Sequence, residues 1–158
     1  MAPRRRSASR NDAPDRKKVS TAATQALTRF PPEHQIELIP NAGARRFLTH
    51  LRQLIADGKD AADMNDAQLR NFALQVEWAS SSFSVAIAMR WNTGGGTGDE
   101  SCTAQCVREK EACLERECGP EGGYTWPCLC CVDCRLAYLA CLAGCVVHGF
   151  HAGGYVYY

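Results

Sequence analysis

The first 101 residues contain no cysteine, and the chain lacks both an apolar export signal and a long hydrophobic run. Arg4, Arg5 and Arg6 are followed by polar and charged residues, whereas a classical signal peptide carries about 7–15 apolar residues there. The longest apolar run, at 136–147, is shorter than the roughly 20 residues that cross a bilayer. We therefore expect no transmembrane segment and no classical signal peptide. Export would then need a dedicated transporter, and the alternative location is the cytoplasm.

Signatures of common catalytic sites are also missing. The sequence has no glycine-rich phosphate loop, no His-Glu-x-x-His zinc motif and no Gly-x-Ser-x-Gly nucleophile turn. Thiol redox motifs of the Cys-x-x-Cys type usually open a helix in an α/β fold, and no such fold pattern surrounds Cys128-x-x-Cys131. We predict that the protein is not an enzyme and has no catalytic residues.

Charge divides the chain into unlike parts. Residues 1–18 carry seven Lys or Arg against two Asp, 19–98 carry seven of each sign, and 99–158 carry four basic against eight acidic residues. The predicted organisation is a disordered basic tail at 1–18, a helical leader or propeptide region at 19–90, a Gly-rich linker at 91–100, and a cysteine-rich helical hairpin with an aromatic tail at 101–158. No aromatic residue interleaves with the basic tail, so we expect no nucleic-acid partner.

Apolar periodicity predicts a small helical bundle before the linker. The pattern indicates helices over 20–30, 33–39, 41–57 and 65–79, with Asn41 and Asn65 or Asp66 at helix starts. Three serines at 80–82 are expected to end the last helix, and 85–89 reads as a short strand or connector. The apolar faces are interpreted as core. The alternative is a groove or helix recognised by a partner such as a maturation enzyme.

The glycine run provides a candidate processing point. Gly94, Gly95 and Gly96 lie between the helical region and the cysteines. Transporters that export peptides with double-glycine leaders cut after such a pair, and a plain hinge is the alternative.

The ten cysteines have mirror-image spacing. They are Cys102, Cys106, Cys113, Cys118, Cys128, Cys130, Cys131, Cys134, Cys141 and Cys145. The first three cysteines are separated by 4 and then 7 positions, and the last three by 7 and then 4 positions. Each triplet therefore lies on one helical stripe, and Gly119, Pro120, Gly122 and Gly123 mark the turn. The class predicted is mainly α, with an antiparallel helical hairpin centred near residue 123.

Two sulfur chemistries fit this hairpin. In the first, disulfides join Cys102 with Cys145, Cys106 with Cys141, and Cys113 with Cys134. The four inner cysteines close two more bonds near the turn, for which Cys118–Cys130 with Cys128–Cys131 is the favoured pairing among the alternatives. Small residues near the seam, among them Gly144, would let the helices approach closely enough. In the second, reduced thiolates and imidazoles bind copper or zinc through Cys102, Cys106, Cys128, Cys131, Cys134, Cys141, Cys145, His148 and His151. The compact cysteine-rich end behind a helical region and a glycine linker favours disulfides and no metal cofactor.

Several stretches resemble a family of bacteriocin precursors related to fulvocin C. They are Phe30-Pro-Pro-Glu-His-Gln, Phe47-Leu-Thr-His-Leu-Arg-Gln-Leu, and Asn65-Asp-Ala-Gln-Leu with Phe72, followed by the cysteine-rich end, so that the resemblance spans about residues 25–158. The cysteine segment also resembles plant α-hairpinin peptides, which are disulfide-stapled antimicrobial hairpins that pair two Cys-x-x-x-Cys motifs.

The resemblance implies the precursor of a secreted cysteine-rich antimicrobial peptide, with residues 99–158 as its active core. The leader would contact export and processing machinery, and the core would bind the envelope or a receptor of a target cell. One alternative is a Cu(I)- or Zn(II)-binding helical protein, and a second is a non-catalytic interaction or adaptor protein. The net charge of 99–158 is −4, whereas most peptides that attack anionic membranes are cationic.

Overall fold

The computed structural model describes residues 16–86, 97–119 and 129–151. Within these ranges the regular structure is entirely helical, which confirms the predicted mainly-α class. Several predicted features lie outside the described residues: residues 1–15 of the basic tail, Gly94 to Gly96, Cys128 and the aromatic tail at 152–158.

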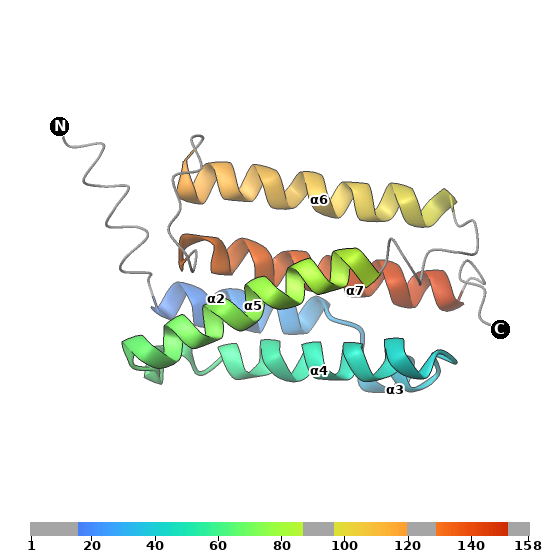
Figure 1. The fold of residues 1–158 in the computed structure, drawn as a ribbon, viewed down its shortest axis with the longest axis horizontal. Helices are drawn as coiled ribbons and strands as arrows, with labels where there is room; N and C mark the ends of the chain where they lie inside the picture. Colours follow the sequence, from blue (N-terminus) through green and yellow to red (C-terminus); the bar gives the residue numbers. More distant parts are fainter. Residues whose placement is uncertain (1–15, 87–96, 120–128, 152–158) are drawn as a thin grey trace.

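The helices form a bundle in which one cysteine-bearing helix is central (Figure 1). Their bounds are α2 Arg16–Arg29, α3 Glu33–Glu37, α4 Ala42–Gly58, η1 Ala61–Asp63, α5 Asp66–Ala86, α6 Thr97–Cys118, η3 Leu129–Cys131 and α7 Val132–His151, where η1 and η3 are short 3-10 helices. Helix α7 packs against α6 on one side and against α2 and α5 on the other, and α4 packs against α2 and α5.

Side-chain caps explain two of the helix starts. The Asn41 side-chain oxygen accepts a hydrogen bond from the Ala44 amide at 2.9 Å, as expected for an N-cap. Asn65 and Gln68 cap each other's backbone amides, with both bonds at 2.8 Å. This reciprocal pair is a capping box, and it fixes the first turn of α5.

Helix α2 begins earlier than the sequence predicts. Residues 16–18 were assigned to a disordered tail, yet α2 starts at Arg16. Arg16 donates from Nε to the Met64 carbonyl at 2.9 Å and pairs with Asp66. Partners that lie about fifty positions away in the sequence hold this turn, so no local pattern reveals it.

Helix α5 ends later than predicted. The three serines at 80–82 do not stop it, and Val85 lies in its last turn rather than in a strand. Ser80 and Phe83 are buried, and the Ser84 hydroxyl contacts both the Ser80 carbonyl at 3.0 Å and the Tyr138 hydroxyl at 2.8 Å. Packing against α7 therefore overrides the low helix propensity of serine.

The predicted leader region and the hairpin share one hydrophobic core. Buried residues of α2 and α5, such as Val19 and Phe83, form one cluster with Leu136, Leu139 and Val146 of α7. Residues 97–100, which were assigned to the linker, lie in α6. The described helices are therefore joined by packing across the predicted boundary.

Candidate functional site

Three disulfides join α6 to α7 along their length. The pairs are Cys102–Cys145, Cys106–Cys141 and Cys113–Cys134, with Cα–Cα distances of 5.9, 5.8 and 5.7 Å. These are the pairs that the mirror-image spacing predicts, because each lies at facing positions of an antiparallel hairpin. The distances fall within the 4.4–6.8 Å range typical of disulfides, so the helices are in close contact.

A fourth disulfide closes the hairpin near its turn. Cys118, the last residue of α6, is bonded to Cys130 in η3, with Cα atoms 5.7 Å apart. Gly119 follows with φ at 94°, a left-handed conformation that glycine adopts without strain. Cys131 is also disulfide-bonded, and its partner, predicted to be Cys128, lies outside the described residues. All nine described cysteines are therefore oxidised.

One predicted aid to close helix approach is wrong. Gly144 was expected to make room at the seam, yet a Cβ added there would meet no atom within 4 Å. The side of α7 at Gly144 therefore has open space, and the close approach at the disulfides does not depend on this glycine.

The disulfides use sulfur atoms that metal binding would require. Two groups of three sulfurs lie within 4.8 Å of one another, the first formed by Cys102, Cys106 and Cys145, the second by Cys118, Cys130 and Cys131. Thiolates are the metal-binding form of cysteine, and a disulfide contains none. Cys134 and Cys141 are likewise oxidised, His148 is exposed, and His151 ends α7. The oxidised structure does not favour the metal alternative.

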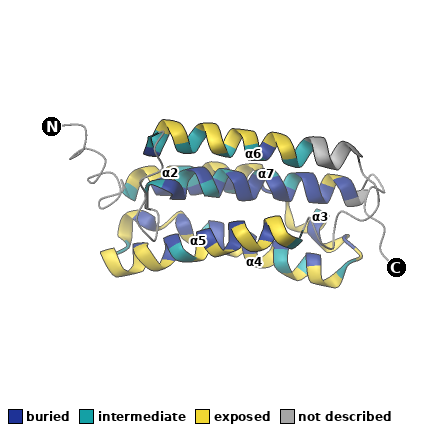
Figure 2. Ribbon diagram, turned by 45° about the horizontal axis from the view of Figure 1, so that its top comes forward, coloured by how far each residue is buried: buried dark blue, intermediate teal, exposed yellow. Residues whose placement is uncertain are grey.

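The two helices of the hairpin differ in polarity. Helix α6 has an exposed side, whereas α7 is buried along most of its length (Figure 2). From residue 102 to the end of α6, the exposed charged residues are Arg108, Glu109, Glu111, Glu115 and Arg116. On α7, Leu136, Leu139, Leu142 and Val146 are at most 1% exposed. The hairpin is thus amphipathic as a unit, with one polar and one apolar helix.

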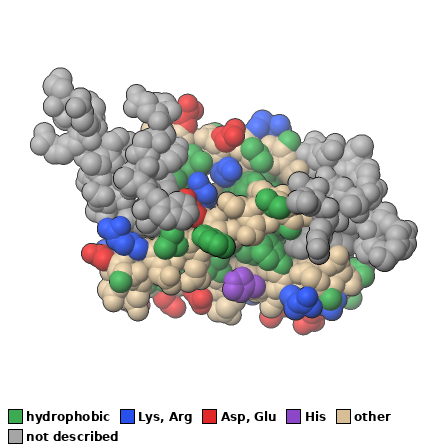
Figure 3. All heavy atoms as spheres, in the orientation of Figure 1, with side chains coloured by type: hydrophobic (Ala, Val, Ile, Leu, Met, Phe, Trp, Pro, Cys, Tyr) green, Lys and Arg blue, Asp and Glu red, His purple; other side chains and the backbone are tan. Residues whose placement is uncertain are grey.

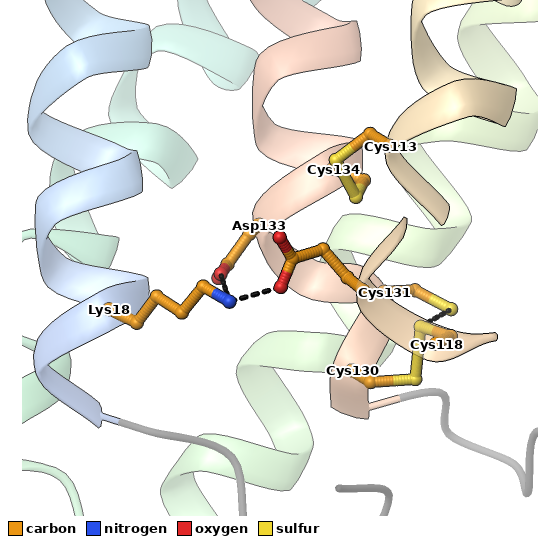
Figure 4. A network of polar contacts seen from close by, with 8 residues as sticks. Lys18, Cys113, Cys118, Cys130, Cys131, Asp133 and Cys134 are labelled. Carbon is orange, nitrogen blue, oxygen red and sulfur yellow. Dashed lines mark hydrogen bonds and ion pairs between the residues drawn. A yellow bond between two sulfur atoms is a disulfide. The ribbon is translucent and has the colours of Figure 1, made fainter. Parts of the chain in front are cut away.

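An ionic contact ties the hairpin to α2. Lys18 forms an ion pair with Glu117 of α6, and its Nζ atom lies 3.8 Å from Oδ2 of Asp133 in α7. Figure 4 shows Lys18 reaching toward the hairpin beside the Cys113–Cys134 disulfide. One cation therefore contacts carboxylates from both helices of the hairpin.

A second polar contact ties the hairpin to α5. The Nη2 atom of Arg135 lies 3.8 Å from Oε2 of Glu77, and both side chains are largely buried. The Tyr138 and Ser84 hydroxyls are 2.8 Å apart. These groups position α5 along α7, since each pairs a polar atom that would otherwise be buried alone.

Lys110 lies close to this contact. Its Nζ atom is 4.4 Å from the centre of the Tyr138 ring. Burial lowers the pKa of the Lys110 ammonium below its usual 10.5, the Arg135 guanidinium lowers it further, and Glu111 partly opposes the shift. Two cations thus share a half-buried position at the junction of the three helices.

A groove, which the sequence left as an alternative to a plain core without placing it, lies between α4 and α5. It has a volume of about 400 Å³, and Phe47, His50, Leu74 and Trp78 line part of it. Trp78 is 69% exposed because it lies off the apolar stripe that faces the core. Side chains in Figure 3 are mixed in type, with hydrophobic ones gathered near the middle of the face. In the sequence, the signal for this groove was Trp78, a large apolar residue that lies off the stripe of core positions.

No protein family, curated protein or solved structure matches the chain. The resemblance to bacteriocin precursors and the absence of enzyme activity therefore remain predictions.

The described residues include one helical segment with the length and composition of a membrane span. It is Val132–Gly149, with 18 residues, a mean hydropathy of 1.3 and 67% of its residues buried. The uninterrupted apolar run within it, at 136–147, is shorter. A buried helix in the centre of a water-soluble bundle can have the same length and composition.

Proposed function

We propose that the chain is the precursor of a secreted, bacteriocin-like antimicrobial peptide whose active core is the cysteine-rich hairpin at 99–158. The observation that carries the proposal is the series of four disulfides in that part of the chain. Structural disulfides persist in oxidising surroundings, which supports an exported protein. The same bonds support a hairpin that keeps its shape outside the cell.

The hairpin is small for a unit that has to fold without other helices. Two helices of about 20 residues bury too little apolar surface to be stable alone. Cross-links that restrict the unfolded chain contribute roughly 2–4 kcal/mol each. A hairpin with disulfides at both ends and in the middle is therefore suited to act apart from the helices before it.

The remaining parts of the chain fit the roles of a precursor. Helices α2 to α5 would serve as the leader that export and processing machinery recognises, and cleavage would occur at Gly94 to Gly96. The released core would act at the envelope or a receptor of a competitor cell.

A growth-inhibition assay tests the proposal. The full chain is produced under oxidising conditions with a site-specific protease sequence in place of residues 94–96, and intact and cut protein are applied to a panel of bacteria. Inhibition by the cut, oxidised protein is expected, and none by the same protein after reduction and alkylation. Equal effects of oxidised and alkylated protein, or no inhibition of any strain, would contradict the proposal. Intact mass after alkylation without reductant checks that no thiol is free.

A further inference from the structure

The apolar surface of α7 carries almost no charge. From Leu136 to the end of α7 there is no Asp, Glu, Lys or Arg. The two charged residues of the Val132–Gly149 segment, Asp133 and Arg135, both lie in its first turn. Their partners from outside the hairpin are Lys18 of α2 and Glu77 of α5. The preceding helices therefore both cover the apolar surface and pair its charges.

No covalent cross-link holds this cover in place. Every cysteine lies at or after Cys102, so the disulfides act only within the cysteine-rich part of the chain. Packing, the two ion pairs and the Ser84–Tyr138 hydrogen bond hold α2 and α5 on α7. After a cut before α6, no covalent bond would join the hairpin to α2 and α5, and its separation would expose the apolar side of α7.

We propose that the separated hairpin binds lipid bilayers lying flat in the interface, with α7 among the acyl chains and headgroups and α6 in water. This inference rests on the proposed function, because it requires release of the hairpin from α2 to α5. An apolar helix joined to a charged one has the polarity of an interfacial amphipathic element.

The disulfides distinguish this arrangement from a membrane span. They hold α6 beside α7 with Cα–Cα distances of 5.7–5.9 Å. If α7 crossed the bilayer, the charged side chains of α6 would enter the hydrocarbon region with it. Each such charge is strongly disfavoured at the membrane centre. With both helices parallel to the surface, those charges remain in water.

Charge also predicts which lipids bind. Residues 99–158 carry four basic and eight acidic residues, so anionic headgroups repel the hairpin. Burial of apolar surface must supply the affinity. Vesicles of phosphatidylcholine should therefore bind the hairpin at least as well as vesicles that contain phosphatidylglycerol.

Vesicle flotation tests the inference with the complete oxidised chain carrying the protease sequence at residues 94–96. Two variants weaken the cover independently: Glu77→Lys opposes Arg135, and Lys18→Glu opposes Glu117 and Asp133. Glu37→Lys and Lys59→Glu make the same charge changes at exposed positions. Circular dichroism before cleavage identifies variants that have lost their helices.

After cleavage, the C-terminal fragment of a cover variant should float with phosphatidylcholine vesicles about tenfold more than the intact chain. The N-terminal fragment should stay at the bottom, and the control variants should behave like the cut parent. Glu109, Glu111 and Glu115 are exposed on α6, so their labelling with a water-soluble carbodiimide and a charged amine, read by peptide mapping, reports where α6 lies. These three residues should be labelled equally well with and without vesicles.

Four results would overturn the inference: no flotation of the C-terminal fragment from either folded cover variant, flotation only with anionic vesicles, flotation of the N-terminal fragment, or protection of Glu109, Glu111 and Glu115 by the bilayer. The flotation and growth assays test the two proposals separately. Flotation without growth inhibition would contradict the antimicrobial function but support membrane binding by the hairpin. Growth inhibition without flotation would support the antimicrobial function but contradict membrane binding.

Discussion

At the scale of single residues, Lys110 is a group whose surroundings disfavour its protonated, charged form. Its pKa is lowered by burial and by Arg135. Because the folded-state pKa lies below that of the unfolded chain, the protonated lysine weakens the fold below the folded pKa. This cost disappears as the pH rises to 10.5, the unperturbed value.

Lys110→Met should therefore raise the free energy of unfolding slightly at neutral pH, since the methionine keeps an apolar stem against Tyr138 and removes the charge. The gain should shrink as the pH rises. Denaturant unfolding without reductant at about pH 7 and about pH 9.5 measures the difference. Lys59→Gln, at an exposed position, should change little at either pH. A gain that grows with pH would contradict the assigned cause.

Two glycines make a matched pair for packing. A Cβ added at Gly58 would lie 2.6 Å from Phe72 Cζ and 3.0 Å from Ala23 Cβ, where α2, α4 and α5 meet. Gly58→Ala should lower the free energy of unfolding by about 1–3 kcal/mol through overpacking. Gly144→Ala meets open space and should raise it by up to about 1 kcal/mol through helix propensity. Thermal unfolding of both variants measures the signs, and equal signs would contradict this explanation.

Residue spacing predicted the cysteine pairs because helical geometry is local. Steps of 4 and 7 residues place sulfurs on one stripe whatever surrounds them. The roles of Lys18 and Glu77 depend instead on which helices meet, and a sequence read alone does not contain that information. The same holds for the open space at Gly144, which only the packed helices define.

At the scale of helices, the contribution of each disulfide to stability depends on the neighbouring disulfides, because the bonds enclose one another. Removing the Cys102–Cys145 bond with the double substitution Cys102→Ser and Cys145→Ala leaves Cys106–Cys141 to close most of the same loop. The loss should be about 2–3 kcal/mol, whereas an isolated loop of that length would lose about 4. Removing Cys106–Cys141 with Cys106→Ala and Cys141→Ser should cost about the same, because bonds on both sides still close the loop and each double substitution empties one buried position, Cys106 at 1% or Cys145 at 2% exposed.

Chemical unfolding without reductant, with mass spectrometry to verify the remaining bonds, measures both losses. A larger loss for the outer pair would show that its strength does not depend on the bond beside it.

Helix ends were the weakest part of the sequence prediction. The sequence predicted residues 16–18 as part of a disordered tail and the serines at 80–82 as the end of a helix. In both places contact with another helix extends the helix. The starts at Asn41 and Asn65 were predictable, because a cap acts on the turn that follows it in the chain. Local signals thus located helix starts better than tertiary extensions.

At the scale of the whole molecule, one core predicts one unfolding transition. Leu139 of α7 is fully buried in the cluster that includes α2 and α5. Leu139→Ala should lower the free energy of unfolding by about 2–5 kcal/mol. Hydrogen exchange should show the same loss of protection at the slowest amides of α2 and α5. Leu38→Ala, at a position that is 69% exposed, should change protection by less than about 0.5 kcal/mol.

Unchanged protection in α2 and α5 after Leu139→Ala would mean that these helices fold independently of the hairpin. Composition had suggested such independence, since charge, cysteine content and glycine all change near residue 98. Composition describes what each segment contains, whereas the core depends on which apolar faces meet.

The nested order of the disulfides also bears on how the oxidised chain reaches the correct pairing. Counted outward from Cys118–Cys130, each bond brings the next pair of cysteines near each other. The bonds can therefore form one after another from the turn to the open end of the hairpin. The nearest error is a slip by one helical turn that pairs Cys106 with Cys145, whose sulfurs lie 3.6 Å apart in the native fold. That error leaves Cys102 and Cys141 as free thiols beside the wrong bond. Attack by the Cys102 thiolate on the Cys145 sulfur restores Cys102–Cys145 and releases Cys106 as a thiolate. An external disulfide oxidant then joins Cys106 to Cys141, so a slip by one turn can be reversed within the hairpin.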